Sequence, residues 1–136
     1  MDEYVDDFVS VLPQEKREKL DYSPESLDVV ERWLLKRYPS NQARKEALRN
    51  EQEDKQLYMG AMCYVGETFR KNWGGIWNVH LNEPDYLYGI LPVIEQKSGG
   101  VLCPAYLMSR AIDTRAGELL KILLEGFMKP QQPGAI

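Results

Sequence analysis

The sequence has 136 residues, 43% of them hydrophobic and 28% charged, which suffices for one hydrophobic core but not comfortably for two. Its formal net charge of -4 argues against nucleic acid as a partner, because neutralising phosphates requires a basic face. No apolar run reaches the roughly 18 residues that span a membrane, and the N-terminus is acidic where a signal peptide is basic. We therefore expect a single domain over residues 1–128, in the cytoplasm and without membrane contact.

The first predicted element is an amphipathic helix over residues 2–12, which Pro13 ends. We interpret the acids on its outer face as solvent-exposed and not as a metal site, because no other type of ligand accompanies them; they are Asp2, Glu3, Asp6 and Asp7. A charged linker over residues 14–19 follows. Ser23 and Pro24 then favour a helix start, with Ser23 as the cap, and this second helix extends to about Arg37.

Residues 41–56 are polar but rich in helix-forming side chains. One continuous helix over residues 41–73 would be about 50 Å long, which exceeds what a domain of this size can cover. We therefore expect either a break near Asn50 or a first half that projects into solvent. A projecting half would offer a surface for a homodimer or another partner, and a simple solvated connection is the alternative.

Residues 57–73 form the central predicted helix. Every residue from Leu57 to Val65 is apolar, aromatic or small, which indicates a helix that is buried on all sides. Gly60 and Gly66 are costly inside a helix and indicate that other backbone packs closely there. The double glycine at 74–75 ends the helix.

A small antiparallel sheet of about three strands should pack on this helix. The predicted strands cover residues 76–81, 86–95 and 101–103, and the glycine-bearing loop 96–100 joins the last two. Gly89 suggests a bulge, and Pro92 suggests an edge position or a bend. The expected fold class is therefore α+β, with N-terminal helices, a central buried helix, the sheet and a C-terminal helix.

After the sheet, residues 104–111 are predicted to form a short helix or a loop. Asp113 or Thr114 can cap a final helix that extends to about Met128, and residues 129–136 should form a flexible tail. The expected buried side of the final helix consists of Leu119, Leu120, Ile122, Leu123, Leu124 and Phe127. Two cysteines, Cys63 and Cys103, lie in apolar segments without CxxC spacing, which favours free thiols in a reducing compartment.

Few side chains suggest catalysis. His80 is the single histidine, and the alternation of its strand places it beside Asn78 on the solvent face, so we predict no metal site. No serine lies in a G-x-S-x-G segment, and the glycine pairs lack the strand-before, helix-after context of a phosphate loop. We predict a protein that is not an enzyme and has no cofactor.

Glu67 and Arg70 are the exception, because they lie three residues apart where the central helix turns polar. One interpretation is a partly exposed structural ion pair. The other is a binding site for a ligand or partner, in which Glu67 is partly buried and faces a second basic group such as Arg110 or Arg115. An aromatic wall would surround this site, formed by Trp73, Trp77, Tyr86, Tyr88 and Tyr106.

The run G-E-x-x-R-x-x-x-G-G-x-W combines these features, at Gly66, Glu67, Arg70, Gly74, Gly75 and Trp77. With Pro104 and a helix after the hairpin, it resembles a group of small uncharacterised bacterial α+β proteins, some of which resemble immunity-type proteins of toxin systems. The resemblance covers residues 57–128 and implies that Glu67, Arg70 and Trp77 belong together, without implying an activity.

The leading functional hypothesis is a protein-interaction module that masks a basic partner such as a toxin domain. The acidic N-terminal helix would supply electrostatic complementarity, and the aromatic-rich sheet would supply anchor residues. The alternative is a small-ligand-binding domain that uses Glu67, Arg70 and the nearby aromatics. An enzyme with Glu67 as general acid or base is the third hypothesis.

Overall fold

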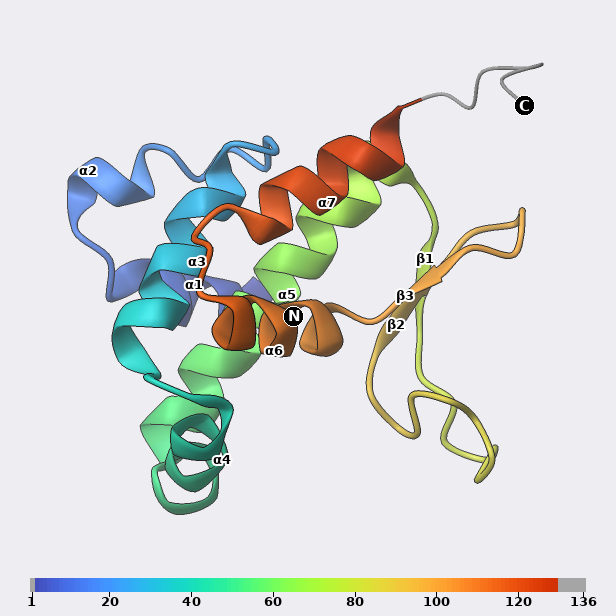
Figure 1. The fold of residues 1–136 in the computed structure, drawn as a ribbon, viewed down its shortest axis with the longest axis horizontal. Helices are drawn as coiled ribbons and strands as arrows, with labels where there is room; N and C mark the ends of the chain where they lie inside the picture. Colours follow the sequence, from blue (N-terminus) through green and yellow to red (C-terminus); the bar gives the residue numbers. More distant parts are fainter. Residues whose placement is uncertain (1, 130–136) are drawn as a thin grey trace.

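A computed structural model describes residues 2–129, and within them seven helices and a three-stranded antiparallel sheet confirm the α+β fold class (Figure 1). The tail predicted for residues 129–136 lies outside the described residues except for the exposed Lys129. The helices are α1 (Asp2–Ser10), α2 (Gln14–Arg17), α3 (Ser26–Arg37), α4 (Asn41–Asn50), α5 (Gln52–Trp73), α6 (Pro104–Thr114) and α7 (Leu119–Met128). The strands are β1 (Ile76–Asn78), β2 (Val93–Glu95) and β3 (Val101–Leu102).

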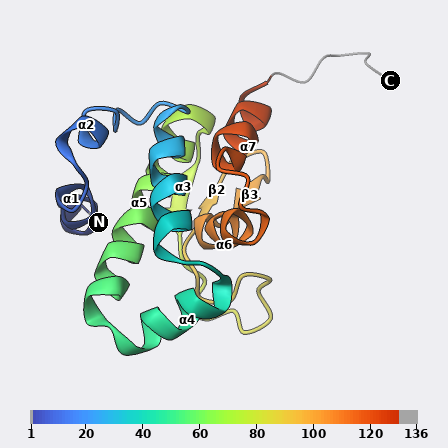
Figure 2. The ribbon, with the colours of Figure 1, turned by 60° about the vertical axis from the view of Figure 1, so that its left-hand side comes forward.

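Helix α5 lies at the centre of the structure, as its apolar composition predicts. Its 22 residues are buried almost continuously from Leu57 to Phe69, with Met59 as the exposed exception among the apolar ones. Helices α1, α3, α6 and α7 pack against α5 (Figure 2), and in Figure 1 the sheet lies beyond the start of α6, on the opposite side from α3. The buried apolar side chains of these elements form one continuous core cluster.

The two glycines of α5 lie at its closest contacts. A Cβ on Gly60 would lie 2.1 Å from the carbonyl oxygen of Tyr4, so the backbone of α1 packs directly on this position as predicted. A Cβ on Gly66 would lie 2.0 Å from Cη2 of the Trp77 ring. The neighbour at Gly66 is therefore a side chain, and our expectation of close backbone was wrong there. The helix ends at Gly74 with a φ of 100°, which confirms the predicted glycine stop.

The predicted break near Asn50 is confirmed. Glu51 has an extended conformation between α4 and α5, and α4 folds back against α5 and α6 instead of projecting into solvent. The side-chain amide of Asn41 fixes α4 to α6, because its nitrogen lies 2.9 Å from the Ser109 carbonyl and 2.8 Å from the Asp113 carboxylate. Residues 14–19, expected to be a linker, contain the short helix α2.

The sheet has the predicted strand number, but its strands are shorter than predicted. Strand β2 lies between β1 and β3, with Trp77 opposite Ile94 and Ile94 opposite Leu102. Residues 86–92 form turns and not a strand, because the Gly89 N–H bonds to the Tyr86 carbonyl at 3.0 Å and Gly89 has a φ of +59°. Gly89 is thus a turn residue and not a bulge, and Pro92 marks the bend that precedes β2.

The start of α7 is capped by a residue that the sequence did not suggest. Asp113 and Thr114 were predicted to cap it, but both lie within α6. Instead the fully buried carboxylate of Glu31 on α3 accepts the N–H groups of Leu119 at 3.1 Å and Leu120 at 2.8 Å. These are free donors at a helix start, and the helix dipole also favours a negative charge there. Glu31 therefore joins α7 to α3.

The burial of α7 differs from the predicted pattern in part. Leu120 and Leu124 are buried and Leu119 and Leu123 are half-buried, whereas Ile122 is exposed. The side chain of Phe127 is also partly exposed, although its ring contacts two aromatic rings of α5, those of Phe69 and Trp73. Only a narrow stripe of α7 faces α3 and α5.

Substitution of Gly66 by Ala should destabilise the protein, because the added methyl group would overlap the Trp77 ring. We expect the free energy of unfolding to fall by about 2 kcal/mol, as is typical of an overpacked core. Gly126→Ala on α7 is the matched control, since a Cβ there meets no atom within 4 Å, and it should raise this free energy by about 0.5–1 kcal/mol. Urea unfolding measures both changes, and equal stabilisation by the two substitutions would contradict the Trp77 contact.

Glu31→Gln tests the cap on α7. The amide keeps only one acceptor oxygen and turns a donor toward the helix start, so the free energy of unfolding should fall by about 2 kcal/mol. Glu125→Gln changes an exposed residue of the same helix and should alter it by less than about 0.5 kcal/mol. Urea titration measures the free energy of unfolding of both variants. Equally small changes in the two would mean that Glu31 does not stabilise α7.

Candidate functional site

Glu67, Arg70 and Trp77 lie together at the end of α5. The Arg70 guanidinium binds both oxygens of the Glu67 carboxylate, with Nε 2.8 Å from Oε1 and Nη2 3.0 Å from Oε2. The indole N–H of Trp77 donates to Glu67 Oε1 at 2.6 Å. This contact follows from the packing of the Trp77 ring on Gly66, one residue before Glu67.

The Glu67 network is complete without a ligand. The Glu67 side chain is 17% exposed and that of Arg70 is 37% exposed. The hydrogen bonds from Arg70 lower the pKa of the Glu67 carboxyl, and the bond from Trp77 adds to this effect. The expected second basic group is absent from this contact: Arg115 instead donates to the carbonyl oxygens of Leu35 at 2.6 Å and Tyr38 at 3.0 Å. Arg110 is exposed.

The predicted aromatic wall divides into separate contacts. Trp73 lies against Phe127 with ring centroids 5.5 Å apart, and Trp77 covers Gly66. The three tyrosines form their own edge-to-face series, with 6.0 Å between the rings of Tyr86 and Tyr88 and 5.1 Å between those of Tyr88 and Tyr106. The structure therefore groups Trp77 with Glu67 and Arg70, whereas Tyr86, at one end of the tyrosine series, stacks on His80.

In the structure His80 is surrounded by side chains that the sequence analysis did not predict to contact it. Its Nε2 lies 2.8 Å from Glu95 Oε2, its Nδ1 bonds to Glu83, and its ring stacks on Tyr86 with 3.7 Å between centroids. The side chain is only 13% exposed, so our placement of His80 on the solvent face was wrong. His80 does lie beside Asn78, with Nε2 3.4 Å from the Asn78 amide nitrogen, but Glu83, Glu95 and the Tyr86 ring cover it.

The charges around His80 favour its protonated form. The bond to Glu83 raises the pKa of the imidazole, and the bond to Glu95 raises it further. The Asn78 amide lies 2.7 Å from Glu95 and lowers the pKa of that carboxyl, with His80 as a second cause. His80 thereby ties the segment after β1 to β2.

Little in this arrangement suggests catalysis. Glu83 and Glu95 bind opposite nitrogens of the ring and cannot converge on one ion, and residues 2–129 contain no group of His, Cys, Asp and Glu side chains suited to a metal. No serine or cysteine of these residues bonds to His80 as a nucleophile would. Cys63 and Cys103 are free and buried, and burial raises the pKa of both thiols.

The segment that His80 anchors, residues 79–91, is here named the 79–91 loop. In Figure 1 it lies below the sheet, and its Tyr88 ring contacts the Tyr106 ring of α6, with 5.1 Å between centroids. Its most exposed apolar side chains are Leu87 at 77%, Leu81 at 71% and Ile90 at 69%. From residue 72 to residue 96 the sequence contains no lysine or arginine, while Glu83 and Asp85 are exposed in the loop. The loop therefore presents an apolar and acidic surface.

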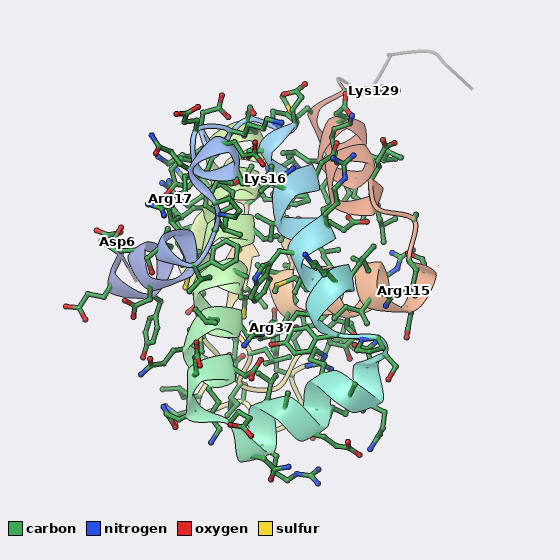
Figure 3. The ribbon with its side chains drawn as sticks, turned by 90° about the vertical axis from the view of Figure 1, so that its left-hand side faces the viewer. Asp6, Lys16, Arg17, Arg37, Arg115 and Lys129 are labelled. Carbon is green, nitrogen blue, oxygen red and sulfur yellow. The ribbon has the colours of Figure 1, made fainter. Side chains whose placement is uncertain are left out.

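Two grooves have the opposite charge, and the second of them borders the loop at Leu91. The α1–α3 groove has a volume of about 580 Å³ and contains Trp33 with the cations Lys16, Arg32, Lys36 and Arg37. Figure 3 faces this side of the molecule, with Lys16 and Arg37 labelled. The α4–α6 groove, of about 660 Å³, contains Arg44, Lys45 and Lys55 above an apolar floor. Neither groove is lined by an acidic residue or by Glu67.

Comparison with models of known protein families, with curated proteins and with solved structures finds no match to this chain. The resemblance to bacterial α+β proteins thus stays a prediction from the G-E-x-x-R-x-x-x-G-G-x-W motif. Over residues 2–129, none of the helices combines the length and the apolar character that crossing a membrane requires.

The His80 contacts predict a specific pH dependence. The pKa of the His80 imidazole is raised in the folded protein, so its contacts stabilise the fold when the ring is protonated. This stability is fully present below the ordinary histidine pKa of about 6.5 and is lost as pH rises through the folded-state pKa. NMR titration of the imidazole, the only one in the chain, should give a midpoint above about 6.5. Glu95→Gln should lower this midpoint, whereas Glu46→Gln, with the same charge change on exposed α4, should leave it unchanged. A wild-type midpoint at or below about 6.5 would contradict the geometry.

Proposed function

We propose that this chain is a non-enzymatic protein-binding module that contacts a basic protein through the 79–91 loop. The observation that supports this proposal is the combination of exposed Leu81, Leu87 and Ile90 with acids and without any lysine or arginine. Large exposed apolar side chains that lie near one another often indicate an interaction site. The acids Glu83 and Asp85 would attract a partner surface rich in lysine and arginine.

The anchoring of the loop strengthens this proposal. His80 bonds to Glu83 within the loop and to Glu95 on β2, and it stacks on Tyr86. A loop held in one conformation loses less conformational entropy when a partner binds. The exposed leucines would act as anchors on a prearranged support.

In this proposal the acidic helix α1 contributes less to partner binding than the sequence analysis expected. The acids of α1 are exposed as expected, and Asp6 extends outward at the edge of the molecule (Figure 3). However, α1 lies on the other side of α5 from the 79–91 loop (Figure 2). The loop must therefore supply both the charge and the anchors, and α1 would contribute only long-range attraction.

The partner type suggested by the motif resemblance is a toxin-like basic domain, which an immunity-like protein would mask in the cytoplasm. The alternative, a small-ligand site at Glu67 and Arg70, has less support. Both carboxylate oxygens are already bonded to Arg70 and Trp77, and a ligand would have to break those bonds.

Leu87→Glu tests the proposed surface, because Leu87 is the most exposed of the loop's apolar residues and its substitution should leave the fold intact. Loss of an anchor residue at an interface typically costs 2 kcal/mol or more, so the Kd for the partner should rise about 30-fold. The matched control is Ile122→Glu, which places the same charge on an exposed apolar position of α7.

The experiment is affinity capture from a lysate of the source organism, followed by Kd measurement with the purified partner. We expect wild-type protein and Ile122→Glu to capture one basic protein in stoichiometric amount at low salt, and Leu87→Glu to lose it. High salt should weaken the capture, because it screens the attraction of opposite charges. An acidic partner, equal capture by Leu87→Glu, or no stoichiometric partner would each overturn the proposal.

A further inference from the structure

The α4–α6 groove has the form of a small-molecule site. Its walls come from α4, α5, α6 and the end of the 79–91 loop, and its volume of about 660 Å³ lies within the usual range for such sites. Apolar side chains form the floor, and they include Leu48, Met59, Met62, Leu91 and Ala105. Methionine adapts its shape readily, which suits the binding of a flexible apolar group.

The cations of this groove have no acidic partner. Arg44 Nε donates to the neutral side-chain oxygen of Asn41 at 3.0 Å. Among residues 2–129, none of Arg44, Lys45 and Lys55 forms an ion pair. The groove thus places three positive charges without an ion-pair partner beside an apolar floor.

The groove also contains a buried hydroxyl group without a partner. Tyr58 lines the groove and is 8% exposed, and its hydroxyl makes no hydrogen bond within the described residues. A buried polar group in this state carries a desolvation cost, which a ligand could relieve. The Arg44 guanidinium lies over the Tyr58 ring, with Cζ 5.4 Å from the centroid. A rotamer change of Arg44 would open the phenol to the groove, and such changes are common on binding.

We infer that the α4–α6 groove binds a small amphipathic anion, an apolar chain or ring system that ends in a carboxylate or phosphate. The apolar body contacts the methionines and Leu91, and the anionic end binds Arg44 and the hydroxyl of Tyr58. Lys45 and Lys55 supply additional positive potential at the exposed rim. The α1–α3 groove fits less well, because no unpartnered buried hydroxyl among the described residues lines it and its Arg37 is already paired with Asp54 at 2.7 Å.

This inference is independent of the proposed protein partner, and the two can fail separately. Leu87→Glu, which should abolish partner capture, does not touch the groove lining and should leave anion binding unchanged.

Isothermal titration calorimetry with monomeric decanoate tests the inference. Decanoate should bind with one-to-one stoichiometry and a Kd below about 1 mM, and it should raise the Tm because it binds only the folded state. Acetate has the charge without the apolar body, and decanol has the body without the charge, so both should bind at least about tenfold more weakly.

Two sets of variants locate the site. Lys45→Glu with Lys55→Glu should weaken decanoate binding about tenfold or more, whereas Arg32→Glu with Lys36→Glu, the same charge change in the α1–α3 groove, should leave it unchanged. Tyr58→Phe should weaken binding about tenfold without lowering the Tm, because the hydroxyl has no bond to lose in the free protein.

Several outcomes would overturn the inference. The first is the absence of saturable one-to-one decanoate binding with a Kd below about 1 mM. The second is an equal loss of decanoate affinity in the two charge-reversed double variants. The third is an unchanged affinity of Tyr58→Phe for decanoate. Binding to anionic phospholipid vesicles without binding of free decanoate would assign the groove to a membrane surface and would also overturn it.

Discussion

Close packing at Gly60 and Gly66 is the constraint from which the rest of the arrangement follows. The absence of a side chain at Gly60 lets the backbone of α1 lie on α5, and its absence at Gly66 admits the Trp77 ring. That ring holds β1 beside α5, and the Trp77 N–H reaches Glu67. Strand β2 pairs with β1 and brings Glu95 to His80, which fixes the 79–91 loop. The loop on which the proposed function rests is thus positioned by a glycine on the central helix.

Polar contacts between distant residues complete this packing at the ends of helices. Glu31 caps α7, Arg115 binds the last carbonyl groups of α3, and Asp54 binds both Arg37 and Tyr38 at 2.7 Å. Each contact satisfies groups at a helix end, where backbone or side-chain donors and acceptors lack partners within the helix. Helix α3 takes part in all three. Its polar residues therefore fix the relative positions of α5, α6 and α7, while its apolar stripe supplies the core.

The elements that the sequence predicts well are those set by local composition. The unbroken apolar run from Leu57 to Val65 predicts the buried helix. The length of residues 41–73 left two alternatives, a break near Asn50 or a projecting first half, and the structure shows the break. One group of errors concerns contacts between residues far apart in the chain. Glu31 and Leu119 are separated by 88 residues, and His80 finds Glu95 only across the sheet. A second error is local, since the predicted length of the strand over residues 86–95 was too great. Residues 86–92 have β-forming side chains, but their backbone forms turn hydrogen bonds instead.

Net charge is a poor guide to the surfaces of this protein, because its charges are segregated along the chain. Ten of the 17 lysine and arginine residues fall between positions 16 and 55, and none falls between 72 and 96. The first region forms α2, α3, α4 and the start of α5, which line both cationic grooves. The second forms β1, the 79–91 loop and β2, which are acidic and apolar. A formal net charge of -4 describes neither surface. The arguments for a basic protein at the loop and for a small anion in the groove are therefore compatible, because each rests on a local field that is strongest within about one Debye length of its own charges.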